Sequence, residues 1–283
     1  MFPTTLMVTD SEGDPSERYI QTRQLGLTTW VYKQPSTAHQ IVCKRVPRDS
    51  VELLFHTQMS EKNDPIFVGP ITIRIDRDFA LMVFPFSGLD AQDWSHQQLW
   101  YTHGQLTCQV VESLTQKLWL FHETYHMSMG DIKPGNIVYD THTDRVRYID
   151  LEYVTRQPVA VVRNAPLGLS KLVGLDDLTI NIPDPYTRHY RQETTIGYTS
   201  YQKRLGHNYS VFENDQYALA TTIYCMITGE DPPFCDTRPL DPKHWMQVHS
   251  WALEHLQKIL CNQWDPENIT FVTKVIGKRW GLF

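Results

Sequence analysis

The sequence predicts an α+β protein with a small β-rich N-terminal lobe and a larger α-rich C-terminal lobe. Three observations support this fold class. Short apolar runs separated by turns dominate residues 19–86, long segments with helical periodicity follow only after Gly88, and a proline, Pro85, lies at the junction. We place the lobes at about 18–86 and 87–283. Residues 1–17 are polar and carry Asp, Ser, Glu, Gly and Pro, so we expect a loose N-terminal tail there.

The composition excludes several classes of protein. With 283 residues, 41% hydrophobic and 20% charged, the chain is globular in type rather than collagen-like or mainly disordered. A net charge of −6 gives no sign of a nucleic-acid-binding surface. No apolar run is long enough for a membrane span, and the N-terminus lacks a signal-peptide pattern. Five scattered cysteines without a C-x-x-C pair favour a reducing compartment. We therefore expect an intracellular protein, in the cytoplasm or nucleus of its own or a host cell, with no nucleic-acid partner and no membrane span.

The first lobe carries the signals of strands and of one short helix. Runs of apolar and β-branched residues predict strands at Thr29–Tyr32, Gln40–Val46, Pro70–Ile75 and Ala80–Phe86. The turn Asp76-Arg77-Asp78 between the last two runs suggests a hairpin. Residues 50–59 instead show helical periodicity, and Ser50 is a suitable N-cap for that helix.

The second lobe begins with a long amphipathic helix. Apolar residues recur at helical spacing from Leu106 to Phe121, which predicts a helix over about 104–123. Two short strands follow, at Asn136–Tyr139 and Val146–Ile149. Beyond them we expect a largely irregular stretch at 155–210. Two further helices are predicted, at 214–228 and at 245–261.

Polar residues suited to chemistry gather at two places in the second lobe. The first is the stretch 129–138, MGDIKPGNIV, which contains Asp131, Lys133 and Asn136; the second is Asp150, at the end of the second short strand. Because this strand forms a hairpin with the strand beside Asn136, we expect these side chains to meet at one edge of a cleft. A carboxylate with an amide oxygen suits Mg²⁺, and a second carboxylate beside a lysine suits phosphoryl transfer to a hydroxyl. Such residues are also common in solvated turns, so the local pattern alone leaves a purely structural loop open.

The order of motifs resembles that of the eukaryotic protein kinase superfamily. The stretch 129–138 is similar to the catalytic loop H-R-D-x-K-P-x-N-x-L, and Asp150-Leu151-Glu152 is similar to D-F-G, fourteen residues after Asn136. Ile41-Val42-Cys43-Lys44 is similar to V-A-I-K on a predicted strand, and residues 214–234 resemble the family helix S-D-V-W-S-L with its T-G-x-x-P-F end. The ordered match spans about 20–261. The chain therefore resembles a divergent serine/threonine protein kinase with a two-lobed fold, and departures of this sort are frequent in viral or bacterial kinases.

The resemblance implies an ATP site between the lobes. The residues implied around the nucleotide are Gly26, Val31, Val42, Lys44, Glu52, Val138 and Asp150. Lys44 would hold the α- and β-phosphates and would itself be oriented by Glu52. Asn136 and Asp150 would hold Mg²⁺.

The resemblance also implies roles for the catalytic loop. Asp131 would orient a Ser or Thr hydroxyl of a protein substrate, and Lys133 would neutralise the γ-phosphate. Asn136 completes the implied catalytic set. Asp215 would anchor the backbone of this loop from below.

Several departures from the family pattern leave other functions open. Only Gly26 remains of the glycine-rich loop, Glu152 replaces the glycine of D-F-G, and Gln202 replaces the glutamate of A-P-E, which is compatible with an inactive pseudokinase that acts as an interaction module. Gly130-Asp131 and the run Ile-Asp-Leu-Glu echo choline- and aminoglycoside-kinase-like sequences, which is compatible with a small-molecule kinase. The stretch 122–126, HETYH, formally matches a zinc-protease helix, but a zinc hydrolase would leave the ordered kinase-like motifs unexplained.

Overall fold

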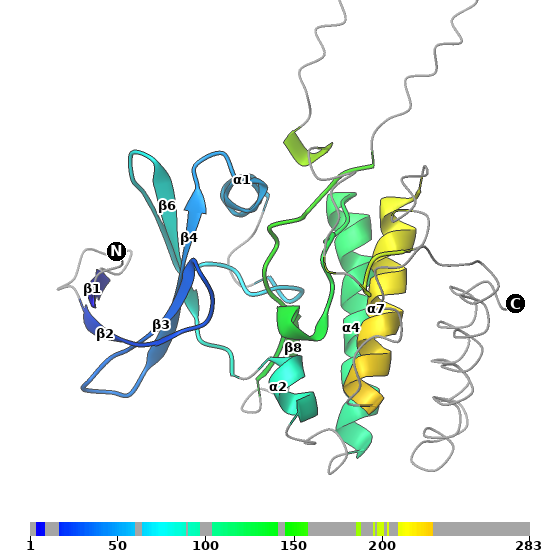
Figure 1. The fold of residues 1–283 in the computed structure, drawn as a ribbon, viewed down its shortest axis with the longest axis horizontal. Helices are drawn as coiled ribbons and strands as arrows, with labels where there is room; N and C mark the ends of the chain where they lie inside the picture. The colour runs from blue at the N-terminus through cyan, green and yellow to red at the C-terminus, as the bar shows by residue number, and fades with distance from the viewer. Residues whose placement is uncertain are drawn as a thin grey trace, which may run out of the picture.

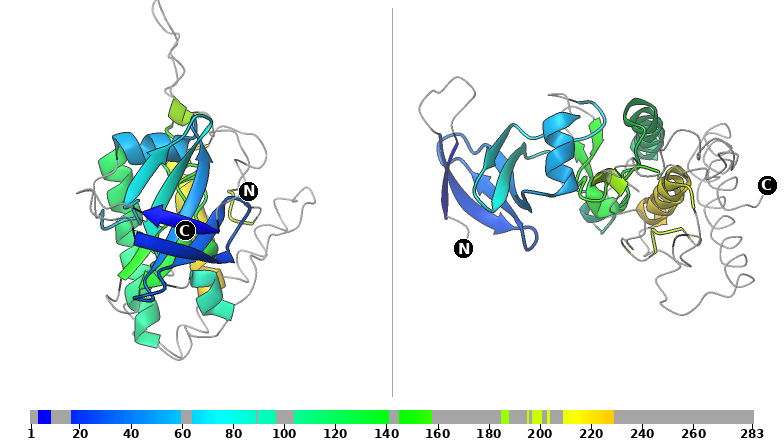
Figure 2. Two further views of the ribbon diagram at one scale, coloured as in Figure 1. Left: turned by 90° about the vertical axis from the view of Figure 1, so that its left-hand side faces the viewer. Right: turned by 90° about the horizontal axis from the view of Figure 1, so that it is seen from above.

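The computed structural model describes residues 4–8, 17–59, 64–88, 90–96, 104–140, 145–157, 185–187, 195, 197–200, 203 and 209–228. It is an α+β structure in which a curled antiparallel sheet, built by the N-terminal part of the chain, is followed by helices (Figure 1). The right-hand view of Figure 2 shows the sheet and the long helices at opposite ends of the described chain. No helix within these ranges is long and apolar enough to cross a membrane.

The sheet has six antiparallel strands in the order β1-β2-β3-β4-β6-β5. Its strands are β1 Thr5–Val8, β2 Glu17–Gln24, β3 Thr29–Lys33, β4 Gln40–Pro47, β5 Thr72–Ile75 and β6 Phe79–Pro85. The four strands predicted from apolar runs are confirmed, with boundaries shifted by one or two residues. The expectation of a loose tail over residues 1–17 is wrong at β1, which pairs with β2. The reason is packing, since Leu6 is buried in a cluster with Tyr19 and Trp30.

The helices and a second small sheet follow in sequence order. The elements are α1 Val51–Gln58, α2 Ala91–His96, α4 Gly104–Tyr125, the 3₁₀ turn η1 Pro134–Asn136, the hairpin strands β7 Ile137–Asp140 and β8 Arg145–Tyr148, the 3₁₀ turn η3 Pro185–Thr187, and α7 Val211–Thr228. Ser50 caps α1 as expected, because its hydroxyl accepts a hydrogen bond from the Leu53 amide at 3.2 Å. The predicted helix at 245–261, the residue Gln202 and most of the stretch 155–210 lie outside the described residues.

One hydrophobic core connects α1 with α4, α7 and the β7–β8 hairpin. Phe55 of α1 lies at its centre and is fully buried. Its ring centroid lies 5.5 Å from that of Phe67, 5.7 Å from that of Phe121 and 5.1 Å from that of Tyr125, and the last two residues belong to α4. This aromatic cluster fixes α1, and with it the adjacent strand β4, against the helical part of the chain.

Replacing Phe55 by alanine is expected to lower the free energy of unfolding by about 3 to 5 kcal/mol, because it removes a buried ring and leaves a cavity. Urea denaturation of the wild-type and variant proteins measures this loss. Leu27→Ala is the control, since Leu27 is 92% exposed and its truncation should change the free energy of unfolding by less than about 0.5 kcal/mol. Equal losses in the two variants would contradict the central position of Phe55.

Candidate functional site

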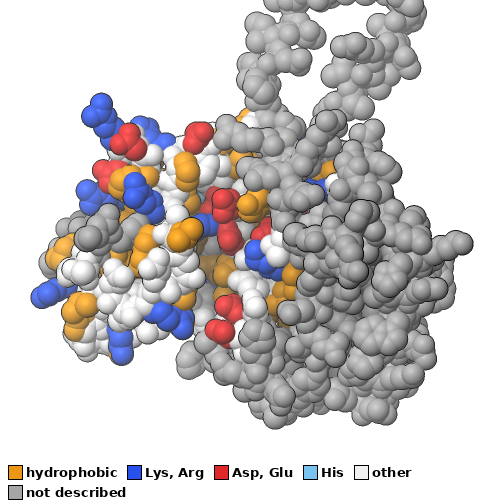
Figure 3. Space-filling model, in the orientation of Figure 1, with side chains coloured by type: hydrophobic (Ala, Val, Ile, Leu, Met, Phe, Trp, Pro, Cys, Tyr) orange, Lys and Arg blue, Asp and Glu red, His pale blue; other side chains and the backbone are white. Residues whose placement is uncertain are grey.

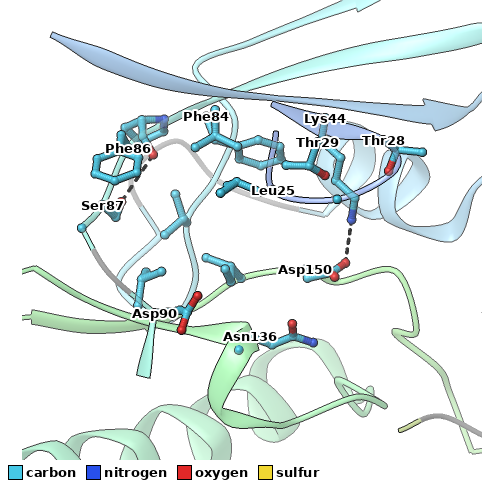
Figure 4. A pocket seen from close by; sticks show the side chains of 18 of the residues that line it. Leu25, Thr28, Thr29, Lys44, Phe84, Phe86, Ser87, Asp90, Asn136 and Asp150 are labelled. Carbon is cyan, nitrogen blue, oxygen red and sulfur yellow. Dashed lines mark hydrogen bonds and ion pairs between the residues drawn. The ribbon is translucent and has the colours of Figure 1, made fainter. Parts of the chain in front are cut away.

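A cavity of ≈ 660 Å³ lies between the sheet and the β7–β8 hairpin. Its walls come from the β2–β3 loop, from β4, from the chain that follows β6, and from the hairpin side. Figure 4 shows Lys44, Thr28 and Thr29 on the sheet side, with Asn136 and Asp150 opposite them. In the space-filling view, acidic side chains are visible where the sheet meets the rest of the described chain (Figure 3). The cavity therefore has a wall rich in hydrogen-bonding groups and a strongly charged interior.

Lys44 joins three parts of the chain at this cavity. It lies on β4, and its Nζ is 2.6 Å from a carboxylate oxygen of Glu52 on α1 and 2.6 Å from one of Asp150, just after β8. The Lys44 side chain is 12% exposed and that of Glu52 only 1%, whereas Asp150 is 37% exposed. The predicted pairing of Lys44 with Glu52 is confirmed. Asp150 is the partner that still faces solvent.

The burial of this pair changes both pKa values. Burial alone would lower the pKa of Lys44, but the carboxylates of Glu52 and Asp150 outweigh it and raise this pKa above its ordinary value. Burial raises the pKa of Glu52 from 4.5 to about 7, although the charge of Lys44 acts in the opposite direction. Lys44 is therefore a permanent cation near neutral pH, and Glu52 takes up a proton on mild acidification.

The loop before β7 gathers the other predicted polar residues around Asp131. The carboxylate of Asp131 accepts hydrogen bonds from Lys133 Nζ at 2.7 Å and from the Thr195 hydroxyl at 2.8 Å. Lys133 also donates to the Thr195 hydroxyl at 2.8 Å. The side-chain nitrogen of Asn136 donates to the backbone oxygen of Asp131 at 2.8 Å and to its carboxylate at 3.2 Å. Because the nitrogen of this amide is held on Asp131, its oxygen is left to face the cavity, as Figure 4 shows.

Asp215 of α7 holds the start of this loop in place. Its carboxylate is fully buried and accepts hydrogen bonds from the Met129 amide at 2.7 Å, the Gly130 amide at 3.0 Å and the Ser128 hydroxyl at 2.8 Å. The expectation that Asp215 anchors the loop backbone is confirmed. His122 Nε2 lies 2.8 Å from the same carboxylate, so the first histidine of the H-E-x-x-H stretch belongs to this anchor.

Gly130 is required by the backbone geometry of the loop. Its φ is +81°, a region that L side chains rarely adopt, and a Cβ atom there would collide with the carbonyl oxygen of Tyr153. Any side chain at this position would push the loop away from the segment that follows Asp150. The close approach therefore holds the loop before β7 against the segment that follows Asp150.

The structure brings most of the predicted residues together. Those that line the cavity are Gly26, Val42, Lys44, Glu52, Asn136, Val138 and Asp150. Asp131 and Lys133 lie beside it, connected through Asn136. Val31 differs from the expectation: it is the register partner of Val42 in the sheet, but it is buried and does not reach the cavity wall.

Sequence reasoning missed several residues of the wall. These include Thr28, Thr29, Phe84, Phe86 and Asp90. Burial raises the pKa of Asp90 above its ordinary value, against the effect of the backbone amides of Asp93 and Gln92. Thr28 and Thr29 follow Gly26 in the stretch that resembles the glycine-rich loop, and Phe84 and Phe86 end the predicted strand 80–86, but none of the four was named as a binding residue, and no motif marks Asp90. A register argument could have found Thr29, because it lies opposite Lys44 in the β3–β4 pair.

No model of a known protein family matches the chain, and no curated protein is significantly similar to it. Function is therefore inferred from the geometry of the cavity and of the loop around Asp131.

The raised pKa of Glu52 predicts how stability changes with pH. The Glu52 carboxyl keeps its proton to a higher pH in the folded chain than in the unfolded chain. Its contribution to the free energy of unfolding is therefore fully present below about pH 4.5 and is lost as pH rises through about 7. In Glu52→Gln this contribution is absent. The free energy of unfolding of the wild type minus that of the variant should therefore fall by about 2 kcal/mol between pH 5 and pH 8, measured by urea denaturation. A difference that stays constant or rises with pH would contradict the assignment.

Proposed function

We propose that the chain has a two-lobed protein-kinase-like fold and transfers the γ-phosphoryl group of ATP to Ser or Thr hydroxyls of a protein. The observation that carries the proposal is the doubly ion-paired Lys44 on one wall of a cavity, facing Asn136 and Asp150 on the other. Asp131, with Lys133 bound to it, lies next to this wall. Phosphoryl transfer requires a fixed cation to hold the phosphates, oxygen ligands for Mg²⁺, and a carboxylate near a lysine at the transferred group. Lys44, the oxygens of Asn136 and Asp150, and Asp131 with Lys133 would supply them.

The donor set fits a nucleotide triphosphate with a divalent cation. Lys44 is a permanent positive charge whose Nζ has three hydrogens, two of them directed at carboxylates, so the third is available to a phosphate oxygen. The Asn136 oxygen and the partly exposed Asp150 carboxylate are hard ligands of the kind that Mg²⁺ prefers. Bound Mg²⁺ would neutralise the phosphate oxygens. Such neutralisation is needed, because five carboxylates and only two cationic side chains line the cavity.

Apolar residues at the other end of the cavity suit an aromatic base. Val42 comes from β4, Phe84 and Phe86 from the end of β6 and the chain after it, and Val138 from β7. Flat apolar walls of this kind bind a ring by burying its faces. The nucleotide would then extend from these residues toward Lys44.

In this proposal Asp131 acts on the acceptor hydroxyl. Its carboxylate accepts hydrogen bonds from the hydroxyl and the amide of Thr195, which supports recognition of a Ser or Thr hydroxyl, and the acceptor would take the place of Thr195. In the proposed step the acceptor oxygen forms a bond to the γ-phosphorus, the bond to the β–γ bridging oxygen breaks, and ADP leaves. The hydroxyl proton passes to Asp131, while Lys133 offsets the negative charge at the transferring group.

One observation favours a second candidate, a nucleotide-binding protein without transferase activity. The amides of Leu25 and Gly26 both donate to the backbone oxygen of Thr29, at 2.9 and 3.3 Å, and so close the β2–β3 loop on itself. These two amides are not directed at a nucleotide. A weaker hold on the phosphates would lower the rate of transfer, and a pseudokinase is the limiting case.

The substitution Asp131→Asn is expected to lower the initial rate of phosphoryl transfer by about 10²- to 10⁴-fold, because the amide cannot accept the hydroxyl proton. The assay uses purified protein, Mg²⁺, γ-labelled ATP and generic protein substrates. Asp78→Asn, in the exposed turn between β5 and β6, is the matched control and should keep the wild-type rate. Melting temperatures check that both variants are folded.

Three results would go against this proposal. Full activity in Asp131→Asn would exclude the catalytic assignment. Binding of Mg-ATP without any transfer by the wild type would favour the pseudokinase. Transfer to sugar or choline hydroxyls, but never to protein, would favour a small-molecule kinase.

A further inference from the structure

The β2–β3 loop that covers the cavity has an unusual distribution of hydrogen-bond donors. Its amides at Leu25 and Gly26 are both used within the loop, as described above. The backbone oxygen of Thr28 accepts a hydrogen bond from the Arg45 amide at 2.8 Å, which fixes the loop to β4. Any contact between this loop and an anion in the cavity must therefore come from other groups.

Two threonine hydroxyls lie at the required place. Thr28 and Thr29 both line the cavity, and Figure 4 shows them beside Lys44. Thr29 is the register partner of Lys44 in the antiparallel β3–β4 pair, so the two side chains project from the same face of the sheet as direct neighbours. Neither hydroxyl has a hydrogen-bond partner among the residues that the structure describes.

The geometry of the loop does not require a glycine at position 26. A Cβ atom at this position would meet nothing within 4 Å, and its φ is not in the left-handed region. The loop therefore keeps its shape without a glycine there. With the amides of Leu25 and Gly26 used inside the loop, the hydroxyls of Thr28 and Thr29 are donors that this loop can offer to the cavity.

We propose that the hydroxyls of Thr28 and Thr29 bind the phosphate oxygens of the nucleotide in place of the loop amides. This inference rests on the proposed function, because it requires a nucleotide in the cavity. A hydroxyl donates one hydrogen bond, and phosphate oxygens are strong charged acceptors. Together with the free hydrogen of Lys44 Nζ, the two hydroxyls form a phosphate site at the junction of β3 and β4. The site explains how a loop with one glycine can still hold a triphosphate.

The test measures binding rather than activity, with Mg-ATP and adenosine as paired probes in calorimetric titrations. Thr28→Val and Thr29→Val each remove a hydroxyl while keeping the size of the side chain. Each should raise the Kd for Mg-ATP about tenfold, because a hydrogen bond to a charged acceptor is lost. The Kd for adenosine, which has no phosphate, should stay within about twofold. Thr29→Ser restores the donor and should bind Mg-ATP within about threefold of the wild type.

Leu27→Ala is the matched control in the same loop, because Leu27 is 92% exposed and does not line the cavity, and it should leave both Kd values within about twofold. If the wild type binds Mg-ATP and the Thr28→Val/Thr29→Val double variant binds it equally well, the inference is overturned while the proposed function stands. If the valine variants lose adenosine and Mg-ATP to the same extent, the threonines have a structural role and the inference is likewise overturned. If the wild type binds neither ligand, the proposed function itself fails, and the inference fails with it.

Discussion

The ion pairs of Lys44 are the interaction on which the rest of the site depends. One ammonium group joins a strand of the sheet, the first turn of α1 and the segment after β8. Glu52 is almost completely buried, so without Lys44 its charge would have no compensation. The aromatic cluster around Phe55, one helical turn further along α1, holds this helix in the position that the pair requires. The two sides of the cavity are thus fixed relative to each other by one polar contact and one apolar cluster.

Asp215 has the corresponding role on the other side of the cavity. A single buried carboxylate collects two consecutive backbone amides and the Ser128 hydroxyl, which fixes the path of the chain just before Asp131. The close approach of Gly130 to Tyr153 then brings the segment after β8 against this loop. As a result Asn136 and Asp150, which come from two separate stretches, both line the cavity, and Asp131 lies beside it, in contact with Asn136. Buried polar groups with all partners in place are what make such an arrangement rigid.

Much of this could be predicted from the sequence, and the reasons differ from residue to residue. The pairing of Lys44 with Glu52 and the anchor at Asp215 were expected from the resemblance of the motif order to protein kinases, with Glu61 as a weaker candidate for the partner of Lys44. The strand β1 could not be predicted, because four residues show no clear periodicity and their burial depends on Trp30 and Tyr19 in later strands. Thr29 was missed because its place on the cavity wall depends on the register of β3 against β4, which puts it opposite Lys44. The sequence alone does not fix this register. Val31 pairs with Val42 in the β3–β4 register and is buried without lining the cavity, so its expected contact with a nucleotide stays a prediction.

The most direct test of the central claim is a crystal structure of the chain with Mg²⁺ and a non-hydrolysable ATP analogue. The account predicts the base between Val42 and Val138, a phosphate oxygen within hydrogen-bonding distance of Lys44 Nζ, and the metal ion on Asn136 Oδ1 and Asp150. An analogue bound elsewhere on the chain would contradict the account. So would an analogue in the cavity with its phosphates directed away from Lys44 and Asp150.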